Sequence, residues 1–109
     1  MVTNAVSVRV FASPAVACGA GITWEGATNY LRKRIHQRFG EDVAVEFIEM
    51  FSPHSFDFPD VLRALEQGNT LPIVRVGEEI VSQGTKLTES RIAATVARSL
   101  AMIRTEEES

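Results

Sequence analysis

Four stretches of the chain distribute apolar residues as β-strands do. In the first stretch, Val6, Val8 and Val10 are separated by single polar residues, and this period of two places every second side chain on one face. Gly77 and Glu78 lie between the last two stretches and favour a tight hairpin there. The predicted strands are residues 5–11, 43–48, 72–76 and 79–82.

Three other stretches repeat apolar residues every three or four positions, which is the spacing of amphipathic helices. The first helix is predicted over residues 23–39, with Thr23 as its N-cap and Gly40 just past its end. A short second helix is predicted over residues 59–67, with a proline in its first turn. The last helix is predicted to begin after Thr88, which is a suitable N-cap residue.

These elements follow one another in the order β-α-β-α-β-β-α. A helical crossover between the first two strands makes them parallel, and a tight turn makes the last two antiparallel. The sequence therefore predicts an α/β fold with a four-stranded mixed sheet and helices packed on its faces. We expect residues 1–104 to form a single domain and residues 105–109 to form a disordered acidic tail.

The segment from Thr70 to Gly84 has the most specific pattern. It reads threonine, leucine and proline, then a strand, a glycine turn, a second strand and a glycine loop. This segment and the element order, up to about Ile103, resemble the thioredoxin-fold superfamily, in particular glutaredoxin-like and small uncharacterised bacterial thioredoxin-like proteins. The resemblance implies a thioredoxin-like fold and a cis peptide bond between Leu71 and Pro72.

The resemblance also implies that the first, second and fourth strands run in one direction and the third runs against them. The carboxyl ends of those three strands then meet the start of the third strand. Ligands usually bind at such an edge of an open sheet. The segments expected at this edge are residues 12–22, residues 50–57, Leu71-Pro72 and Gln83-Gly84.

Cys18 is the only cysteine, which excludes an internal disulfide and a cysteine-rich zinc site. It precedes the first predicted helix, whose dipole and free amides favour a thiolate. One interpretation is a reactive monothiol, and the other is a small buried apolar residue. If residues 18–21 align with the Cys-x-x-Cys motif of the similar families, Cys18 takes the position of the attacking thiol. If residues 15–18 align with the motif, the position of the attacking thiol is occupied by an alanine and that thiol is lost. Both alignments lack a dithiol.

The leading hypothesis is a protein in which Cys18 attacks or binds a thiol-bearing protein or a small thiol. If it is an enzyme, it is a monothiol-type thiol oxidoreductase that needs no cofactor or metal. The alternative is a non-catalytic adaptor that binds an extended peptide or partner protein at the same edge. The substrate-binding residues implied by the resemblance are Thr70, Leu71, Pro72, Gln83 and Gly84. A glutathione-dependent monothiol mechanism stays open, although Gln83-Gly84 replaces the paired glycines of glutaredoxins.

The 50–57 segment and the residue after it supply further candidates. His54 is either a base for Cys18 or a solvated loop histidine, and the sequence favours the second interpretation. Phe51, Phe56 and Phe58 either cover the end of the sheet, which we favour, or line an apolar groove for a partner.

Composition and charge then limit the partners. The chain has 109 residues, 45% of them hydrophobic and 23% charged, which is typical of a globular domain. Its net charge of −3 comes entirely from Glu106, Glu107 and Glu108. The basic stretch at residues 32–38 is interpreted as a solvated helix face, so we expect no nucleic-acid partner. No apolar stretch is long enough to cross a membrane, and a cytoplasmic location is expected. A homodimer through Cys18 stays open.

Overall fold

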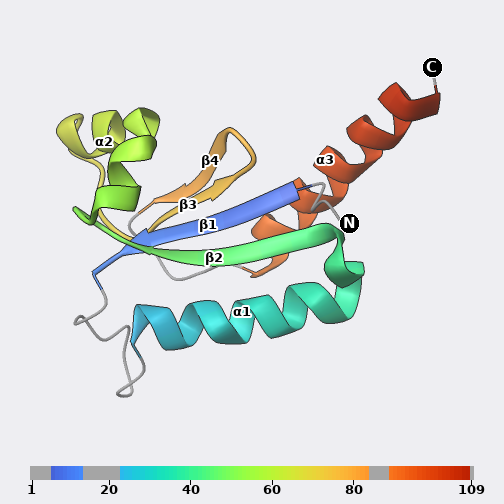
Figure 1. Ribbon diagram of the computed structural model, residues 1–109, viewed down its shortest axis with the longest axis horizontal. Helices are drawn as coiled ribbons and strands as arrows, with labels where there is room; N and C mark the ends of the chain where they lie inside the picture. The colour runs from blue at the N-terminus through green and yellow to red at the C-terminus, as the bar shows by residue number, and fades with distance from the viewer. Residues whose placement is uncertain (1–5, 14–22, 84–88, 109) are drawn as a thin grey trace.

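The computed structural model of the protein describes residues 6–13, 23–83 and 89–108, except for the side chains of residues 82, 83 and 104–108. The strands and α-helices follow one another along the chain in the predicted order, β-α-β-α-β-β-α (Figure 1). In chain order the elements are β1 (Val6–Ala12), α1 (Trp24–Phe39), the 3-10 helix η1 (Gly40–Asp42), β2 (Val43–Glu49), the 3-10 helix η2 (Pro53–Asp57), α2 (Pro59–Glu66), β3 (Ile73–Val76), β4 (Glu79–Gln83) and α3 (Glu89–Glu108).

The four strands form one mixed sheet in the order β2-β1-β3-β4. Strand β1 pairs with β2 in parallel, while β3 is antiparallel to both of its neighbours, β1 and β4. Strands β1, β2 and β4 therefore run in one direction and β3 in the other. The predicted α/β class, the mixed sheet and the strand directions are confirmed.

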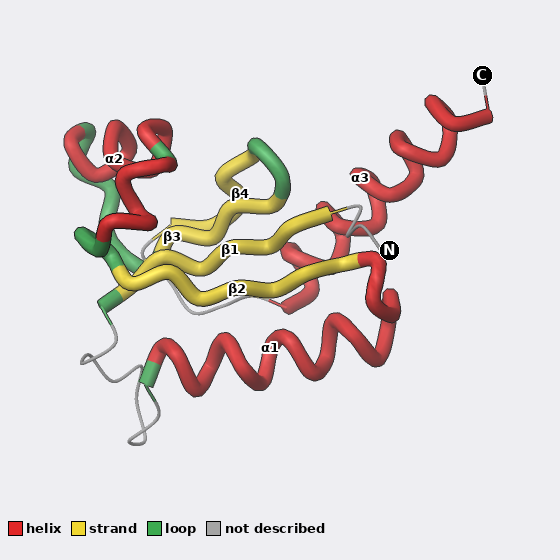
Figure 2. Tube along the Cα trace, in the orientation of Figure 1, coloured by secondary structure: helices red, strands yellow, loops and turns green. Residues whose placement is uncertain are grey.

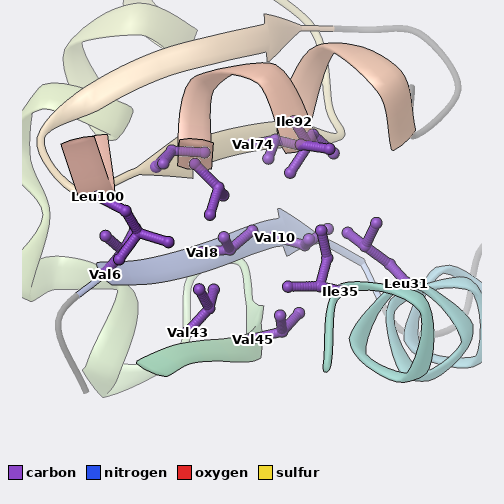
Figure 3. Packing of buried hydrophobic residues seen from close by; sticks show 13 residues of the cluster. Val6, Val8, Val10, Leu31, Ile35, Val43, Val45, Val74, Ile92 and Leu100 are labelled. Atoms are coloured by element: carbon purple, nitrogen blue, oxygen red, sulfur yellow. The ribbon is translucent and has the colours of Figure 1, made fainter. Parts of the chain in front are cut away.

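Helices cover both faces of the sheet, α1 and α3 on one and α2 on the other (Figure 2). Val6, Val8 and Val10 of the central strand β1 point into the layer formed with α1 and α3, which is the larger core (Figure 3). Phe11 lies in the smaller core against α2. The alternation predicted from the sequence thus decides which side chains meet which helix.

Helix α1 begins and ends at the capping residues that the sequence predicts. The amide of Gly26 donates a 3.0 Å hydrogen bond to the hydroxyl of Thr23, so Thr23 is the N-cap. Gly40 follows the helix at φ 72°, and its amide donates to the carbonyl of His36. A residue with a side chain would be strained in this left-handed conformation, which explains the glycine.

Three local predictions need correction. Residues 50–57, expected to be a plain loop, contain the 3-10 helix η2. Strand β3 begins at Ile73 instead of residue 72, since Pro72 has no amide hydrogen to donate to the sheet. Helix α3 continues to Glu108, whereas residues 105–109 were expected to be a disordered tail. Glutamate is a good helix former, so the chain continues the helix after its last packed turn. The predicted N-cap Thr88 lies outside the described residues.

Ile92 of α3 is fully buried between the helix and the sheet, and it provides a test of this core. We expect Ile92→Ala to lower the free energy of unfolding by about 2–5 kcal/mol, because it leaves a cavity against the valines of the sheet. Ser90→Ala, at an exposed position of the same helix, should change it by less than about 0.5 kcal/mol. Urea denaturation of both variants makes the comparison, and equal effects would contradict this packing.

Candidate functional site

The carboxyl ends of β1, β2 and β4 meet the start of β3 at one end of the sheet. In the strand register Ala12 lies beside Glu49, and Ile73 lies between Phe11 and Gln83. We call this end of the sheet the carboxyl edge. In Figure 2 this end of the sheet lies on the side of α2. Four separate parts of the chain therefore meet at one place.

Part of the predicted binding set is found at the carboxyl edge. The peptide bond between Leu71 and Pro72 is cis, as predicted, and it directly precedes β3. Pro72 is buried, Leu71 is half-buried against the α2 core, and Thr70 is exposed. Gln83 reaches the same edge through its backbone, as the last residue of β4. The structure thus brings residues 70–72 and 83 together.

Cys18 and Gly84, the other two predicted site residues, lie outside the described residues. The described chain on either side shows which parts of the fold the Cys18 segment joins. Strand β1 ends at Ala12 on the carboxyl edge, and α1 starts after its N-cap Thr23 beneath the same end of the sheet (Figure 1). Residues 14–22 therefore connect the last strand residues of β1, at the carboxyl edge, to the N-terminal end of α1.

Leu71 also contributes backbone hydrogen-bonding groups. Among the described residues, neither its amide nor its carbonyl has a hydrogen-bond partner. An amide and a carbonyl at the start of a strand can pair with an extended segment, as in the addition of a strand to a sheet. This interaction requires no particular side chain from the protein.

A hydrogen-bonded turn shapes the neighbouring part of the edge. The hydroxyl of Ser52 donates to the carbonyl of Glu49 at 2.6 Å, and the buried hydroxyl of Ser55 donates to the carbonyl of Ser52 at 2.7 Å. These short-range bonds fold residues 49–58 into a compact turn that contains η2 and follows β2. We call these residues the η2 turn. The turn then directs its aromatic residues in two ways.

Phe58 points inward and the other two phenylalanines point outward. The ring of Phe58 is buried and meets that of Phe11 edge-on at 5.1 Å, so Phe58 covers the end of the sheet as predicted. Phe51 and Phe56 instead leave 67% and 57% of their surface exposed. His54 is also exposed, with its ring 5.6 Å from that of Phe58.

Phe51 has an unusual backbone conformation for a bulky residue. Its φ angle is 66°, in the left-handed region that costs a residue with a Cβ atom roughly 1–2 kcal/mol. Such strain often accompanies a functional loop. The exposed ring is therefore held next to the carboxyl edge in spite of an unfavourable backbone.

Two arginines on the α2 face of the sheet were not singled out from the sequence. Arg9 and Arg75 lie side by side on β1 and β3, and both guanidinium groups stack on Phe58, at 4.9 and 5.1 Å from the ring centre. Glu46 pairs with Arg9 at 3.3 Å and Asp60 pairs with Arg75 at 2.8 Å. The sequence feature that could have identified them is an arginine between two valines on each strand, because its side chain must point to the opposite face of the sheet from the valines. The carboxylates balance the two charges, so the cluster is interpreted as structural.

A shallow pocket of about 350 Å³ lies at the opposite end of the sheet from the carboxyl edge. Its walls include Ser7, Gly77, Glu78 and Ser99, near the start of β1 and the β3-β4 turn. None of the predicted site residues lines this pocket. Within the described part of the chain, no three acidic, histidine or cysteine residues group as a metal site would require.

Comparison with known proteins identifies the fold alone. No protein-family model matches this chain, and no curated protein matches its sequence. The structure is similar to the crystal structure of a protein of unknown function from Staphylococcus aureus, with a TM-score of 0.56 and 15% sequence identity. The match covers 88% of this chain and 92% of that one. Among the described residues, no helix is long and apolar enough to span a membrane.

The backbone of Phe51 provides the first test of the edge. Because glycine adopts a positive φ without strain, we expect Phe51→Gly to be more stable than Phe51→Ala by about 1 kcal/mol. Comparing the two variants cancels the loss of the phenyl ring. Thermal and urea unfolding measure the difference, and a less stable glycine variant would contradict the left-handed conformation.

The Arg75 ion pair provides the second test. Asp60→Asn should lower the free energy of unfolding by about 1 kcal/mol, because Arg75 is only 16% exposed and loses its charged partner. Glu79→Gln breaks the pair with Arg98, where both side chains are more than half exposed. That control should change the free energy by less than about 0.5 kcal/mol. A Glu79→Gln effect as large as that of Asp60→Asn would count against the structural role.

Proposed function

We propose that this protein is a thioredoxin-like monothiol protein that binds an extended, thiol-bearing segment at the carboxyl edge. The observation that carries the proposal is the backbone of Leu71, which has no hydrogen-bond partner among the described residues and lies just before β3, on the edge where β1, β2 and β4 end. The segment that holds Cys18 joins the end of β1 to the start of α1. A peptide paired with Leu71 would lie at the same end of the sheet as Ala12, the last residue of β1 before that segment.

The chemistry open to a single thiol is one exchange step. The cysteine of the bound segment enters this step as a disulfide with a second thiol. The Cys18 thiolate attacks one sulfur of that disulfide and forms a mixed disulfide, while the other sulfur leaves as a thiolate. No atom is gained or lost, and the partner disulfide is the only oxidant. Release of Cys18 then requires a second thiol, from the partner or from a small molecule, because this chain has no other cysteine.

A second candidate function is a non-catalytic adaptor, and the exposed phenylalanines favour it. Phe51 and Phe56 offer apolar surface beside the edge, and the backbone of Leu71 offers hydrogen bonds. Neither contribution needs a thiol. In this form of the proposal Cys18 is incidental, and an extended apolar peptide binds through backbone pairing and contact with the two rings.

The reactivity of Cys18 in the folded protein distinguishes the two functions. For the monothiol protein, we expect a small aromatic disulfide to modify Cys18 at least about 3-fold faster at neutral pH than in the urea-unfolded chain. The helix dipole would favour the thiolate only in the folded state. Intact-mass measurements follow the adduct. A thiol that reacts only after unfolding would refute the monothiol function.

Peptide binding tests the adaptor. Phe51→Ala combined with Phe56→Ala should weaken binding of an apolar hexapeptide by about 10-fold, measured by fluorescence anisotropy, and Cys18→Ala should leave it unchanged. Tyr30→Ala removes an equally exposed aromatic ring from α1 and serves as the matched control. Equal losses in the control, or loss of binding in Cys18→Ala, would count against the adaptor.

A further inference from the structure

Strand β2 lies at one edge of the sheet, so half of its backbone groups face away from β1. The amide of Met50 donates to the carbonyl of Ala12 at 3.0 Å, which continues the ladder between the two strands. Successive residues of a strand direct their backbone groups to opposite sides, so every second residue before Met50 faces β1 and the others face outward. The outward residues of β2 are Val43, Val45, Phe47 and Glu49.

Three of the four outward carbonyls accept a hydrogen bond from a side chain. Arg32 Nε donates to the carbonyl of Val45 at 2.8 Å, and His36 Nε2 donates to the carbonyl of Val43 at 2.9 Å. A carbonyl can only accept, so Nε2 of the histidine carries the hydrogen. The last outward carbonyl of β2 accepts from the hydroxyl of Ser52 at 2.6 Å. Acceptors that would otherwise be open to a further strand are therefore already occupied.

Helix α1 places both of its donors along this edge. Arg32 and His36 are four residues apart, which puts them on the same side of the helix, and α1 runs alongside β2 (Figure 1). The guanidinium of Arg32 also donates from Nη1 to the side chain of Asn29 at 2.5 Å, which holds it in place. Two members of the basic stretch at residues 32–38 are thus directed at a strand edge.

The opposite edge strand, β4, is unfavourable for strand addition for a different reason. Two consecutive residues of β3 pair with Ser82 and Ile80, so Val81 between them has no partner in the register. An extra residue of this kind bends an edge strand and interrupts its row of hydrogen-bonding groups. The regular edge of β2 has no such irregularity in its pairing with β1, and its protection comes from side chains.

We propose that Arg32 and His36 keep the edge of β2 closed to strand addition, and that without them β2 pairs with β2 of a second copy. A second copy is the partner because two identical open edges can pair in antiparallel fashion about a two-fold axis. The outward residues Val43, Val45 and Phe47 are of types that favour strands. The proposal is independent of the proposed function, because it involves neither the thiol nor the carboxyl edge.

Sedimentation velocity under reducing conditions tests this closure in the double variant Arg32→Met with His36→Leu, which lacks both donors. We expect it to associate at least about 10-fold more tightly than the wild-type protein, because two carbonyls of each copy lose their partners. As association proceeds, amide hydrogen exchange should slow at Val45 and Phe47, whose amides face the added strand. A folded double variant that associates no more than the wild-type protein would overturn the proposal. So would association that leaves these two amides unprotected.

Two controls separate an open edge from other causes of association. Lys33→Met with Gln37→Leu introduces the same two residue types at exposed positions of α1 and should not promote association. Ile92→Ala lowers stability while leaving the edge closed, and it should not promote association either. If either control associates as the double variant does, the proposal is wrong. Arg32→Met alone opens one carbonyl and should give a smaller gain of about 3-fold, which keeps the test available if the double variant does not fold.

Discussion

The alternation of side chains along β1 is the constraint on which the rest of the structure depends. Strand β1 lies between β2 and β3, so its register fixes the positions of both neighbours. Its valines pack against α1 and α3 on one face, while Arg9 and Phe11 point to the face that α2 covers. A shift of one residue would bury Arg9 among the valines and expose the core. The same register brings Ala12, at the end of β1, level with the ends of β2 and β4.

The carboxyl edge follows from this register and owes little to side-chain chemistry. The cis Leu71-Pro72 segment, the end of β4 and the η2 turn lie at the edge because the strands end there. What they offer a ligand is backbone hydrogen bonding at Leu71 and two exposed phenyl rings. Backbone pairing of this kind is how proteins bind extended peptides, and it is the basis of the proposed function.

The sequence predicted those features that depend on local pattern. The valines of β1, the Thr23 cap and the glycine after α1 act through nearby residues, and each was found as expected. The parallel and antiparallel strand pairs followed from the helical crossover and the tight turn, whereas the cis peptide bond came from a resemblance that extends to about Ile103 and is most specific from Thr70 to Gly84. The stacking of Arg9 and Arg75 on Phe58 could not be predicted, because it joins three distant parts of the chain. The separation of Phe58 from Phe51 and Phe56 depends on the serine hydrogen bonds of the η2 turn, which have no periodic signal.

The central claim is that the carboxyl edge, and not the pocket at the other end of the sheet, is where a partner binds. Two-dimensional amide NMR tests it most directly, during titration with an apolar hexapeptide that contains one cysteine. The account predicts the largest shift changes at Leu71, Ile73 and residues 49–52, which surround the edge. Changes centred on Ser7, Gly77 and Ser99 would place binding at the pocket and contradict the account.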